Sequence, residues 1–404
     1  MNAVPESVTT LFPTVDPCHF WLVGGAVRDQ LLGLDRDDCD VVAMVSPEEL
    51  IAAGFRSVVS RSGQTVWIRA VSDVGQVEIT TIESPADLHA ELSRRDLTIH
   101  AMAVGSDGTL IDPFNGACDC HDRCIRVVHE RSFYDDPVRV LRALRLCAHG
   151  FSLEQGTRRQ LEEVEWDRAL SDVPIERLSR EFLKALAAPY PERFLKEMLD
   201  CSLGREFLPE WFVMQGIPAG PPEKHPEGLL ANHVLLVLEQ LATLTDDPLA
   251  RFCAFGHDLG KCCTDPVSYP RHIGHDLAGV ALARVLCDRL KLPVTYREAL
   301  MGVCRWHTLM NRWDELRDET RLKVAYAAKR GGFYHLLPLV SQADTGCQVD
   351  ARSWEAAGRA VSASAGMLGV SEEQLMACPP DKRGGLLMKA RTAWFRDYLH
   401  GGSD

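Results

Sequence analysis

Residues 23–33 read VGGAVRDQLLG and follow a predominantly apolar stretch at residues 18–23. The apolar stretch predicts a buried strand, and Gly24 and Gly25 predict a tight turn into a short helix that ends at the last glycine of the motif. A strand, a glycine turn and a helix in this order allow backbone N–H groups to approach a phosphate closely. Arg28 adds a guanidinium that can hydrogen-bond to the same anion. Taken alone, a Gly-Gly pair after a strand is more often only a tight turn.

A second predicted strand, DCDVVAM at residues 38–44, carries Asp38 and Asp40 on either side of Cys39. Side chains alternate along a strand, so both carboxylates point to one face. Two like charges this close repel each other unless a cation lies between them. Two divalent ions held in this way activate an attacking hydroxyl and stabilise a leaving pyrophosphate. The alternative is a polar edge strand with solvated carboxylates, and the apolar run after Asp40 argues against it.

The pattern around these motifs predicts a mixed strand and helix unit. Residues 64–70 and 76–82 are rich in β-forming residues and are expected to pair through a turn. Residues 96–104 predict a helix.

Helical patterns dominate from Asp135 onward. We expect one helix over residues 136–149 and another that begins near residues 172–174, because proline is favoured in a first helical turn. Residues 214–226 are rich in proline and glycine, which predicts a linker before a histidine-rich helical block. The predicted fold class is an α/β head followed by an all-α neck and a second all-α domain. The expected boundaries are 1–133, 134–213, 214–350 and 351–404.

The net charge of −13 excludes a protein that adheres to nucleic acid over its whole surface. A local basic surface is still expected, because arginines are concentrated in one stretch. They are Arg94, Arg95, Arg123, Arg126, Arg131, Arg139, Arg142 and Arg145. No apolar run is long enough to span a bilayer, and residues 1–20 lack the features of a secretory signal. We therefore expect a cytoplasmic protein that has no membrane partner.

The 14 cysteines have no regular spacing, so we expect reduced thiols. Cys118, Cys120, His121 and Cys124 superficially resemble a zinc site. Their spacing matches no standard zinc finger and no second ligand pair follows, so no zinc is expected there.

Five motifs occur in order along the chain: VGGAVRDQLLG, the Asp-x-Asp strand, RRDLTIHAMAV (94–104), DPFNG (112–116) and DDPVRVLRALR (135–145). From about residue 20 to 190 the chain resembles the bacterial and eukaryotic class (class II) of tRNA nucleotidyltransferases and their poly(A) polymerase relatives. The resemblance implies that CMP, and possibly the terminal AMP, is added to the tRNA 3′ end from CTP and ATP. It also implies that Mg²⁺ is bound by Asp38 and Asp40.

Base selection is assigned to Asp136 and Arg139, which lie three residues apart on the predicted helix and therefore share a face. A carboxylate and a guanidinium together can imitate a Watson–Crick edge. On spacing alone, the alternative of an ordinary ion pair within the helix is favoured. In the family that the chain resembles, the matching Glu-Asp-x-x-Arg motif reads the incoming CTP or ATP. Asp135 here replaces its glutamate.

Four more residues belong to the expected nucleotide site. Arg142 and Arg145 continue the arginine face and are candidates for contact with triphosphate or the tRNA backbone. Arg95 and Asp96 resemble the family's ribose and triphosphate contacts. His100 stands where the motif usually has asparagine, and it is left outside the predicted site.

A second set of residues, His233, His257, Asp258 and Asp344, resembles the ordered ligands of an HD-type metal phosphohydrolase, with HDLGK (257–261) as the most characteristic piece. Imidazole and carboxylate ligands suit transition metals such as Ni, Mn or Zn. His272, His275 and His307 are candidates to enlarge this site. The resemblance implies phosphatase, 2′-nucleotidase and 2′,3′-cyclic phosphodiesterase activities. Thr308 stands where such relatives can have aspartate, which argues against full hydrolase activity.

The segment between Glu78 and Arg94 contains only 15 residues, ITTIESPADLHAELS. Relatives that add the complete CCA carry a longer, flexible segment here, which is understood to help reshape the pocket from CTP to ATP. Pro85 can begin a helix that runs into Arg94 and leaves little slack. We therefore hypothesise that the chain adds CC and adds the terminal A poorly. A harmless deletion is an equally weighted alternative.

Two other functions compete with this reading. One is a poly(A) polymerase of the same class, and the other is an HD phosphohydrolase with an inactive head. The sequence does not predict the oligomeric state or the role of residues 351–404.

Overall fold

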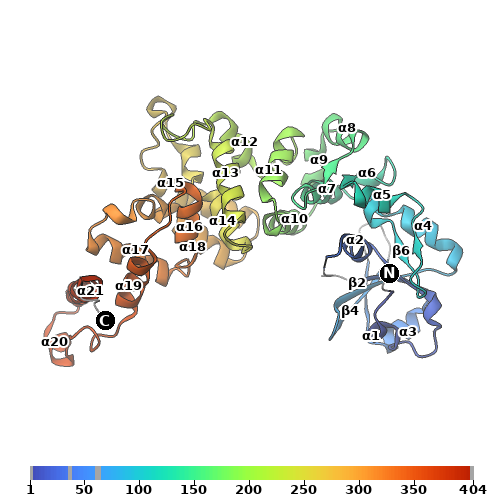
Figure 1. The fold of residues 1–404 in the computed structure, drawn as a ribbon, viewed down its shortest axis with the longest axis horizontal. Helices are drawn as coiled ribbons and strands as arrows, with labels where there is room; N and C mark the ends of the chain where they lie inside the picture. Colours follow the sequence, from blue (N-terminus) through green and yellow to red (C-terminus); the bar gives the residue numbers. More distant parts are fainter. Residues whose placement is uncertain (1–2, 35–38, 60–64, 401–404) are drawn as a thin grey trace. The chain divides into compact units, whose positions relative to one another are not determined.

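The computed structural model describes residues 3–34, 39–59 and 65–400. The chain divides into two compact units, Met1–Pro174 with Glu197–Gly204 and Ile175–Lys196 with Arg205–Asp404. Strands are found in the first unit, and the second unit consists of helices and loops (Figure 1). A mixed sheet followed by helices is therefore confirmed. Within the described ranges, no helix is both long enough and apolar enough to cross a membrane.

Among the described residues, seven strands form one mixed sheet in the order β3-β4-β5-β2-β1-β6-β7. Their bounds are β1 Phe20–Val23, β2 Cys39–Ala43, β3 Arg56–Val59, β4 Thr65–Val71, β5 Gly75–Thr81, β6 Ala103–Val104 and β7 Leu110–Ile111. β2 and β5 run parallel, and the other neighbours run antiparallel. The hairpin predicted over residues 64–70 and 76–82 is confirmed as β4 and β5.

One face of this sheet packs against the helix α4 (Leu88–Ser93). Trp21 and Val23 alternate along β1 and form a buried cluster with Val42, and α4 adds Leu88 and Leu92 to it. Asp40 pairs with Val23 across β2 and β1, so it lies at the end of this apolar face.

The other helices of the first unit are short. Their bounds are α1 Glu6–Thr9, α2 Gly25–Leu32, α3 Pro47–Ala52, α5 Gly116–His121, α6 Ser132–Asp135, α7 Val138–Cys147, α8 Gln155–Glu163 and α9 Trp166–Ser171. Two-residue strands β8 (Cys124–Ile125) and β9 (Ser152–Leu153) pair in parallel. The helix predicted after the glycine turn is confirmed as α2, and Gly33 ends it in the left-handed conformation with φ 69°.

The helix predicted over residues 96–104 is wrong. Only Thr98–His100 forms a helical turn, of 3-10 type (η3), and Ala103–Val104 is the strand β6. Leu97 before the turn is extended, with φ −128° and ψ 149°. Asp96 accepts a hydrogen bond from the Leu97 N–H, and the Thr98 hydroxyl donates to Asp119. These buried polar contacts fix a backbone path that the local pattern does not reveal.

The helix predicted over residues 136–149 begins two residues later than expected, at Val138. Asp136 is extended, with φ −151° and ψ 101°. The reason is Pro137, because proline disfavours helical geometry in the residue before it. Asp136 therefore lies between α6 and α7, and its backbone carbonyl accepts a hydrogen bond from the Arg139 N–H.

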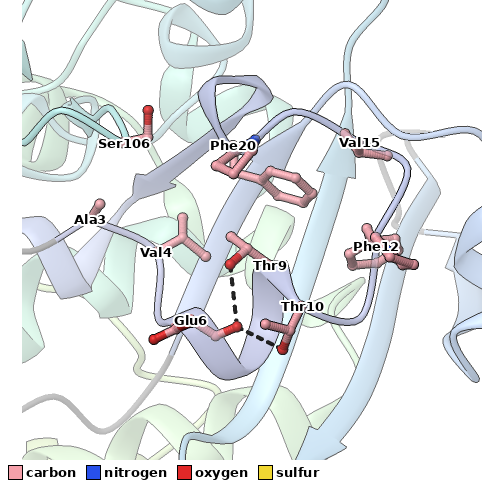
Figure 2. A pocket seen from close by; sticks show the side chains of 11 residues that line it. Ala3, Val4, Glu6, Thr9, Thr10, Phe12, Val15, Phe20 and Ser106 are labelled. Carbon is pink, nitrogen blue, oxygen red and sulfur yellow. Dashed lines mark hydrogen bonds between the residues drawn. The ribbon is translucent and has the colours of Figure 1, made fainter.

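A pocket beside α1 is lined largely by apolar side chains, including Val4, Phe12 and Phe20 (Figure 2). The hydroxyls of Thr9 and Thr10 both donate to the carbonyl oxygen of Glu6, at 3.2 and 2.8 Å. These two hydroxyls thus stabilise the local turn.

The second unit is built from helices joined by loops (Figure 1). Their bounds are α10 Ile175–Ala187, α11 Pro191–Asp200, α12 Pro209–Val213, α13 Leu230–Ala242, α14 Pro248–Gly256, α15 His275–Arg289, α16 Val294–Met310, α17 Asp318–Arg330, α18 Leu336–Thr345, α19 Ala351–Ser362, α20 Glu372–Ala377 and α21 Arg383–His400. α14 and α18 contact each other, and both contact α13 and α16. α15 packs along α16. The predicted linker region, residues 214–226, begins with a 3-10 turn and continues as a loop towards α13.

Candidate active site

The glycine turn lies directly against one carboxylate of the predicted metal site. Gly24 has φ 74°, a conformation that glycine adopts most readily. A Cβ at this position would lie 2.8 Å from Asp40 Oδ2 and 3.2 Å from Arg95 Nη1. Both the backbone conformation and the close approach therefore require glycine. Arg95 Nη1 lies 3.6 Å from Asp40 Oδ2, so the turn, the carboxylate and the guanidinium form one group.

A second carboxylate, Glu78, lies next to Asp40. The two residues are direct partners in the parallel pairing of β2 and β5. Side chains of paired residues in neighbouring strands point to the same face of a sheet. Both carboxylates therefore lie on the face of the sheet that meets the glycine turn. Asp40 is about one third exposed, which leaves it accessible from solvent. Asp38 lies outside the described residues, so the second aspartate of the predicted pair is not placed.

The sequence argument did not assign Glu78 to the site. A lone glutamate within the β-rich stretch GQVEITT was a weak signal, because an acidic residue on a strand is usually a solvated one. Its meaning depends on the pairing of β2 with β5, which the sequence alone does not fix. The pair Asp40 and Glu78 offers oxygen ligands of the kind that Mg²⁺ prefers, so these residues fit the metal that the resemblance implies.

A buried chain of polar side chains links the RRD motif to Arg28 and to α7. Arg142 donates to Asp96 Oδ2 at 3.0 Å, and Asp96 Oδ1 lies 2.8 Å from His100 Nδ1. His100 Nε2 lies 2.7 Å from Arg28 Nη1. A guanidinium can only donate, so His100 Nε2 accepts and the proton is on Nδ1, where it is donated to Asp96. His100 is therefore a neutral connector between Arg28 and Asp96.

The electrostatics of this chain agree with that tautomer. Burial lowers the pKa of His100 and outweighs the attraction of Asp96. Burial acts to raise the pKa of Asp96, but its interactions with His100 and Arg142 outweigh burial, and the pKa lies well below its ordinary value. Asp96 thus stays ionised, and His100 stays neutral at neutral pH. The residue left outside the predicted site proves to join two residues that were inside it.

Two arginines of α7, Arg139 and Arg142, contact the RRD motif. Arg139 donates to the backbone carbonyl oxygens of Ser132, at 3.0 Å, and Arg94, at 2.9 Å. Arg142 and Arg145 follow at three-residue intervals on the same face of α7, and both are half-buried. Asp136 is half-buried just before α7 and shares its first turn with Arg139. The structure therefore brings Asp136 and Arg139 together at the start of the helix instead of within it.

The second unit holds a buried cluster of histidines and aspartates. His233 lies on α13, His257 and Asp258 follow α14, and Asp344 lies near the end of α18. His233 Nε2 is 3.1 Å from Asp344 Oδ1, and His257 Nε2 is 3.2 Å from Asp258 Oδ2. The four predicted ligands, which are far apart in the sequence, are thus brought together. Burial lowers the pKa of His257, but Asp258 and Asp344 outweigh it and raise the pKa above its ordinary value.

Of the three additional histidines, two join this cluster and one does not. His275 and His307 lie 3.4 and 3.3 Å from Asp258 Oδ1. His272 instead uses Nδ1 in a hydrogen bond with the Thr264 hydroxyl and Nε2 in one with the Pro218 carbonyl. Both of its ring nitrogens are occupied, so His272 is not a ligand.

The atoms at the centre of the cluster suit a metal ion. His233 Nε2, His257 Nε2 and Asp258 Oδ1 are buried, and none of them has a hydrogen-bond partner. Buried polar atoms without partners are costly, which favours a cation at this point. Glu227 accepts from His233 Nδ1 at 2.9 Å, and the Ala254 carbonyl accepts from His257 Nδ1 at 2.8 Å. Such contacts fix a ring and direct its other nitrogen at a metal.

Comparison with known proteins separates the chain into recognisable parts. Residues 20–87 and 65–126 match the poly A polymerase head domain, and residues 150–214 match the probable RNA and SrmB-binding site of polymerase A. The multifunctional CCA protein of Methylococcus capsulatus is 40% identical over 321 residues, which cover 74% of each chain. The chain belongs to the multifunctional CCA protein family. As a member of this family it is a nucleotidyltransferase.

Other relatives agree with this assignment. The multifunctional CCA protein of Vibrio cholerae is 38% identical over 76% of this chain and 80% of its own length. The crystal structure of the Bacillus stearothermophilus CCA-adding enzyme in complex with CTP has a TM-score of 0.63 at 20% identity. That comparison covers 99% of this chain and 94% of the other. At this identity the structural likeness establishes a shared fold.

Proposed function

We propose that this nucleotidyltransferase adds CMP from CTP to the 3′ end of tRNA without a nucleic-acid template. The observation that carries the proposal is the group formed by the glycine turn, Asp40, Glu78 and Arg95. Carboxylates on neighbouring strands beside a phosphate-binding turn are what transfer of a nucleotidyl group requires. The match of residues 150–214 to an RNA-binding region supports a neck that contacts RNA. The neck is proposed to span residues 134–213.

Each residue of this group has a separate task. Asp40 and Glu78, with Asp38 as a further expected ligand, would hold Mg²⁺. Mg²⁺ when bound activates the tRNA 3′ hydroxyl and stabilises the leaving pyrophosphate. The N–H groups at Gly24 and Gly25 and the guanidinium of Arg28 orient the triphosphate. Other contacts to the triphosphate and ribose are assigned to Arg95, Asp96, Arg142 and Arg145.

We assign recognition of the nucleotide base to Asp136 and Arg139. Asp136→Ala is expected to weaken discrimination between CTP and UTP by roughly 1–3 kcal/mol, the value of a good bidentate base contact. Triphosphate binding should change less, because Arg28 is not altered. Single-turnover rates with each nucleotide measure this. A variant that still prefers CTP over UTP as strongly as the parent would show that Asp136 is not the reader.

His100 provides a pH-dependent prediction for the same site. Protonation of Nε2 would replace its hydrogen bond from Arg28 with repulsion, so Arg28 would lose its position. Because the pKa of His100 is lowered, this loss begins on the acid side of the ordinary histidine value. Asp96 does not titrate there, since its pKa lies well below the ordinary value of a carboxyl.

We therefore expect the KM for CTP of the parent to rise in acid by more than that of His100→Asn, which carries no titrating group. The measurement is KM and kcat for both proteins across pH. Titration of CTP itself affects both equally, so the difference between the profiles reports on His100. Identical profiles would contradict a positioning role for this residue.

The short segment before the RRD motif supports CC addition without the terminal A. It is structured throughout: β5 ends at Thr81, and a 3-10 turn (η2, Pro85–Asp87) leads into α4. Ser84 N–H donates to Asp87 Oδ2 at 2.8 Å, and Leu88 and Leu92 are buried in the core. Few residues of this segment are therefore left to move when the nucleotide pocket would have to change from a shape that fits CTP to one that fits ATP.

We therefore expect little extension of a tRNA ending in CC when ATP alone is supplied. The control is the same enzyme concentration acting on tRNA that lacks CCA, with CTP. Efficient addition of one AMP at concentrations that also complete CC addition would refute CC-only activity.

The rival function in the same class is poly(A) polymerase. It predicts repeated AMP addition to unstructured RNA, whereas a tRNA enzyme stops after a fixed number of nucleotides. Incubation of unstructured RNA with ATP alone distinguishes the two, because a long ladder of products would favour the polymerase.

A second activity is favoured by the buried histidine and aspartate cluster. We propose a metal-dependent phosphohydrolase of HD type there, using His233, His257, Asp258 and Asp344 with a transition metal such as Ni, Mn or Zn. The orphaned buried nitrogens of His233 and His257 support it. Its substrates would be phosphomonoesters or cyclic phosphates.

A further inference from the structure

We infer that the histidine and aspartate cluster of the second unit binds two metal ions, with Asp258 between them. The inference rests on the proposed hydrolase function of this cluster. Two groups of metal-binding atoms that share no residue lie side by side: His233, His257 and Asp344 form one group, and Asp258, His275 and His307 form the other. In each group the donor atoms lie within 4.8 Å of one another.

The two carboxylate oxygens of Asp258 face different groups. Oδ2 lies 3.2 Å from His257 Nε2 and 3.6 Å from His233 Nε2. Oδ1 lies 3.3 Å from His307 Nε2 and 3.4 Å from His275 Nε2. A carboxylate placed in this way can bridge two cations.

In the second group, Asp258, His275 and His307 direct hydrogen-bond acceptor atoms at one another. His275 Nδ1 is used towards the His272 carbonyl at 2.7 Å, and His307 Nδ1 towards the Val303 carbonyl at 3.1 Å. With Nδ1 as the donor of each ring, Nε2 is the acceptor, and the two Nε2 atoms lie 3.4 Å apart. The Thr308 hydroxyl also lies 3.3 Å from His307 Nε2. Together with Asp258 Oδ1, the two Nε2 atoms form three acceptors around one point. A cation at that point satisfies all three.

Packing places His275 beside Asp258. His275 is the first residue of α15, and the 3-10 turn η5 (Leu259–Cys263) after Asp258 packs closely against this helix. A Cβ at Gly260 would overlap the carbonyl oxygen of His275, so only glycine permits this approach. His307 reaches the same point from α16, which packs along α15. The second group is thus a built part of the fold.

Lys261 contacts one oxygen of the bridging carboxylate. Its ammonium lies 2.6 Å from Asp258 Oδ2 and donates to the Ala219 carbonyl at 2.7 Å. Oδ1, which is buried and has no hydrogen-bond partner, remains available to the second ion. Imidazole and carboxylate ligands select Mn, Fe, Co, Ni or Zn. Two such metal ions held close together suit the hydrolysis of a phosphate ester.

The test is the number of Mn²⁺ ions bound per full-length chain. All proteins carry Asp40→Asn to weaken metal binding in the head. Each is loaded with Mn²⁺, passed through a desalting column, and measured by elemental analysis and by electron paramagnetic resonance. We expect two ions per chain and a spin-coupled signal. His275→Gln should bind one ion and lose the coupling, whereas the matched control His272→Gln should keep both ions.

Three outcomes separate this inference from the proposed hydrolase. Two ions in the parent and one in His275→Gln support both. One ion in the parent, unchanged in His275→Gln, overturns the two-ion site and leaves a one-metal hydrolase standing. If no ion binds and no phosphoester is hydrolysed with Mn, Ni or Zn, the hydrolase proposal fails as well. His307→Gln repeats the test if circular dichroism shows that His275→Gln is unfolded.

Discussion

Asp40→Asn is expected to lower nucleotide addition by at least roughly a thousandfold, because a lost metal ion removes several kcal/mol of charge stabilisation from the transition state. The fold should survive. Asp40 is about one third exposed at the end of β2, and the substitution keeps its size and its place beside Gly24. The measurement is the rate of CMP addition to tRNA that lacks CCA. Asp38→Asn is expected to have the same effect, on the sequence argument alone.

A matched control comes from the same unit. Asp73 is exposed in the turn between β4 and β5, so Asp73→Asn removes one negative charge away from the glycine turn. This variant should retain the parent rate. If Asp40→Asn extended tRNA as the parent does, the metal-binding role of Asp40 would be wrong.

His257→Ala is expected to remove metal-dependent phosphohydrolase activity and to change nucleotide addition little. The substitution deletes a fully buried Nε2 that lies among the proposed metal ligands. The two proposed reactions are assigned to different residues in different units of the chain. Hydrolysis of a 2′,3′-cyclic phosphate and CMP addition are measured on the same preparation.

His335→Ala is a suitable control, because His335 is largely exposed on the same unit. Two results would contradict the account. One is cyclic-phosphate hydrolysis that His257→Ala leaves intact, and the other is loss of nucleotide addition in a variant that circular dichroism shows to be folded.

The local parts of the head were predictable from sequence. The strand, glycine turn and helix around Gly24, and the hairpin of β4 with β5, follow from short-range patterns of apolar residues and glycine. The helix predicted over residues 96–104 failed because buried polar contacts of Asp96 and Thr98 override local propensity. The late start of α7 follows from Pro137 and could have been anticipated.

The arrangement of the sites was harder to predict. Glu78 lies beside Asp40 only because β2 and β5 pair in parallel, and no local pattern encodes that register. His100 departs from the family motif, yet it connects Arg28 with Asp96 through its two ring nitrogens. In the second unit the sequence predicted His272, His275 and His307 equally as additional metal ligands. Only their hydrogen bonds show that His272 faces elsewhere.

Product length on tRNA that lacks its last three nucleotides tests the central claim most directly. The full-length enzyme is incubated with this tRNA and with CTP, ATP, UTP and GTP, singly and together, and the products are resolved at single-nucleotide resolution. We predict extension by two nucleotides with CTP alone, none with the other nucleotides alone, and little further growth when ATP joins CTP. No extension with any nucleotide, or a long ladder with ATP alone, would contradict the account.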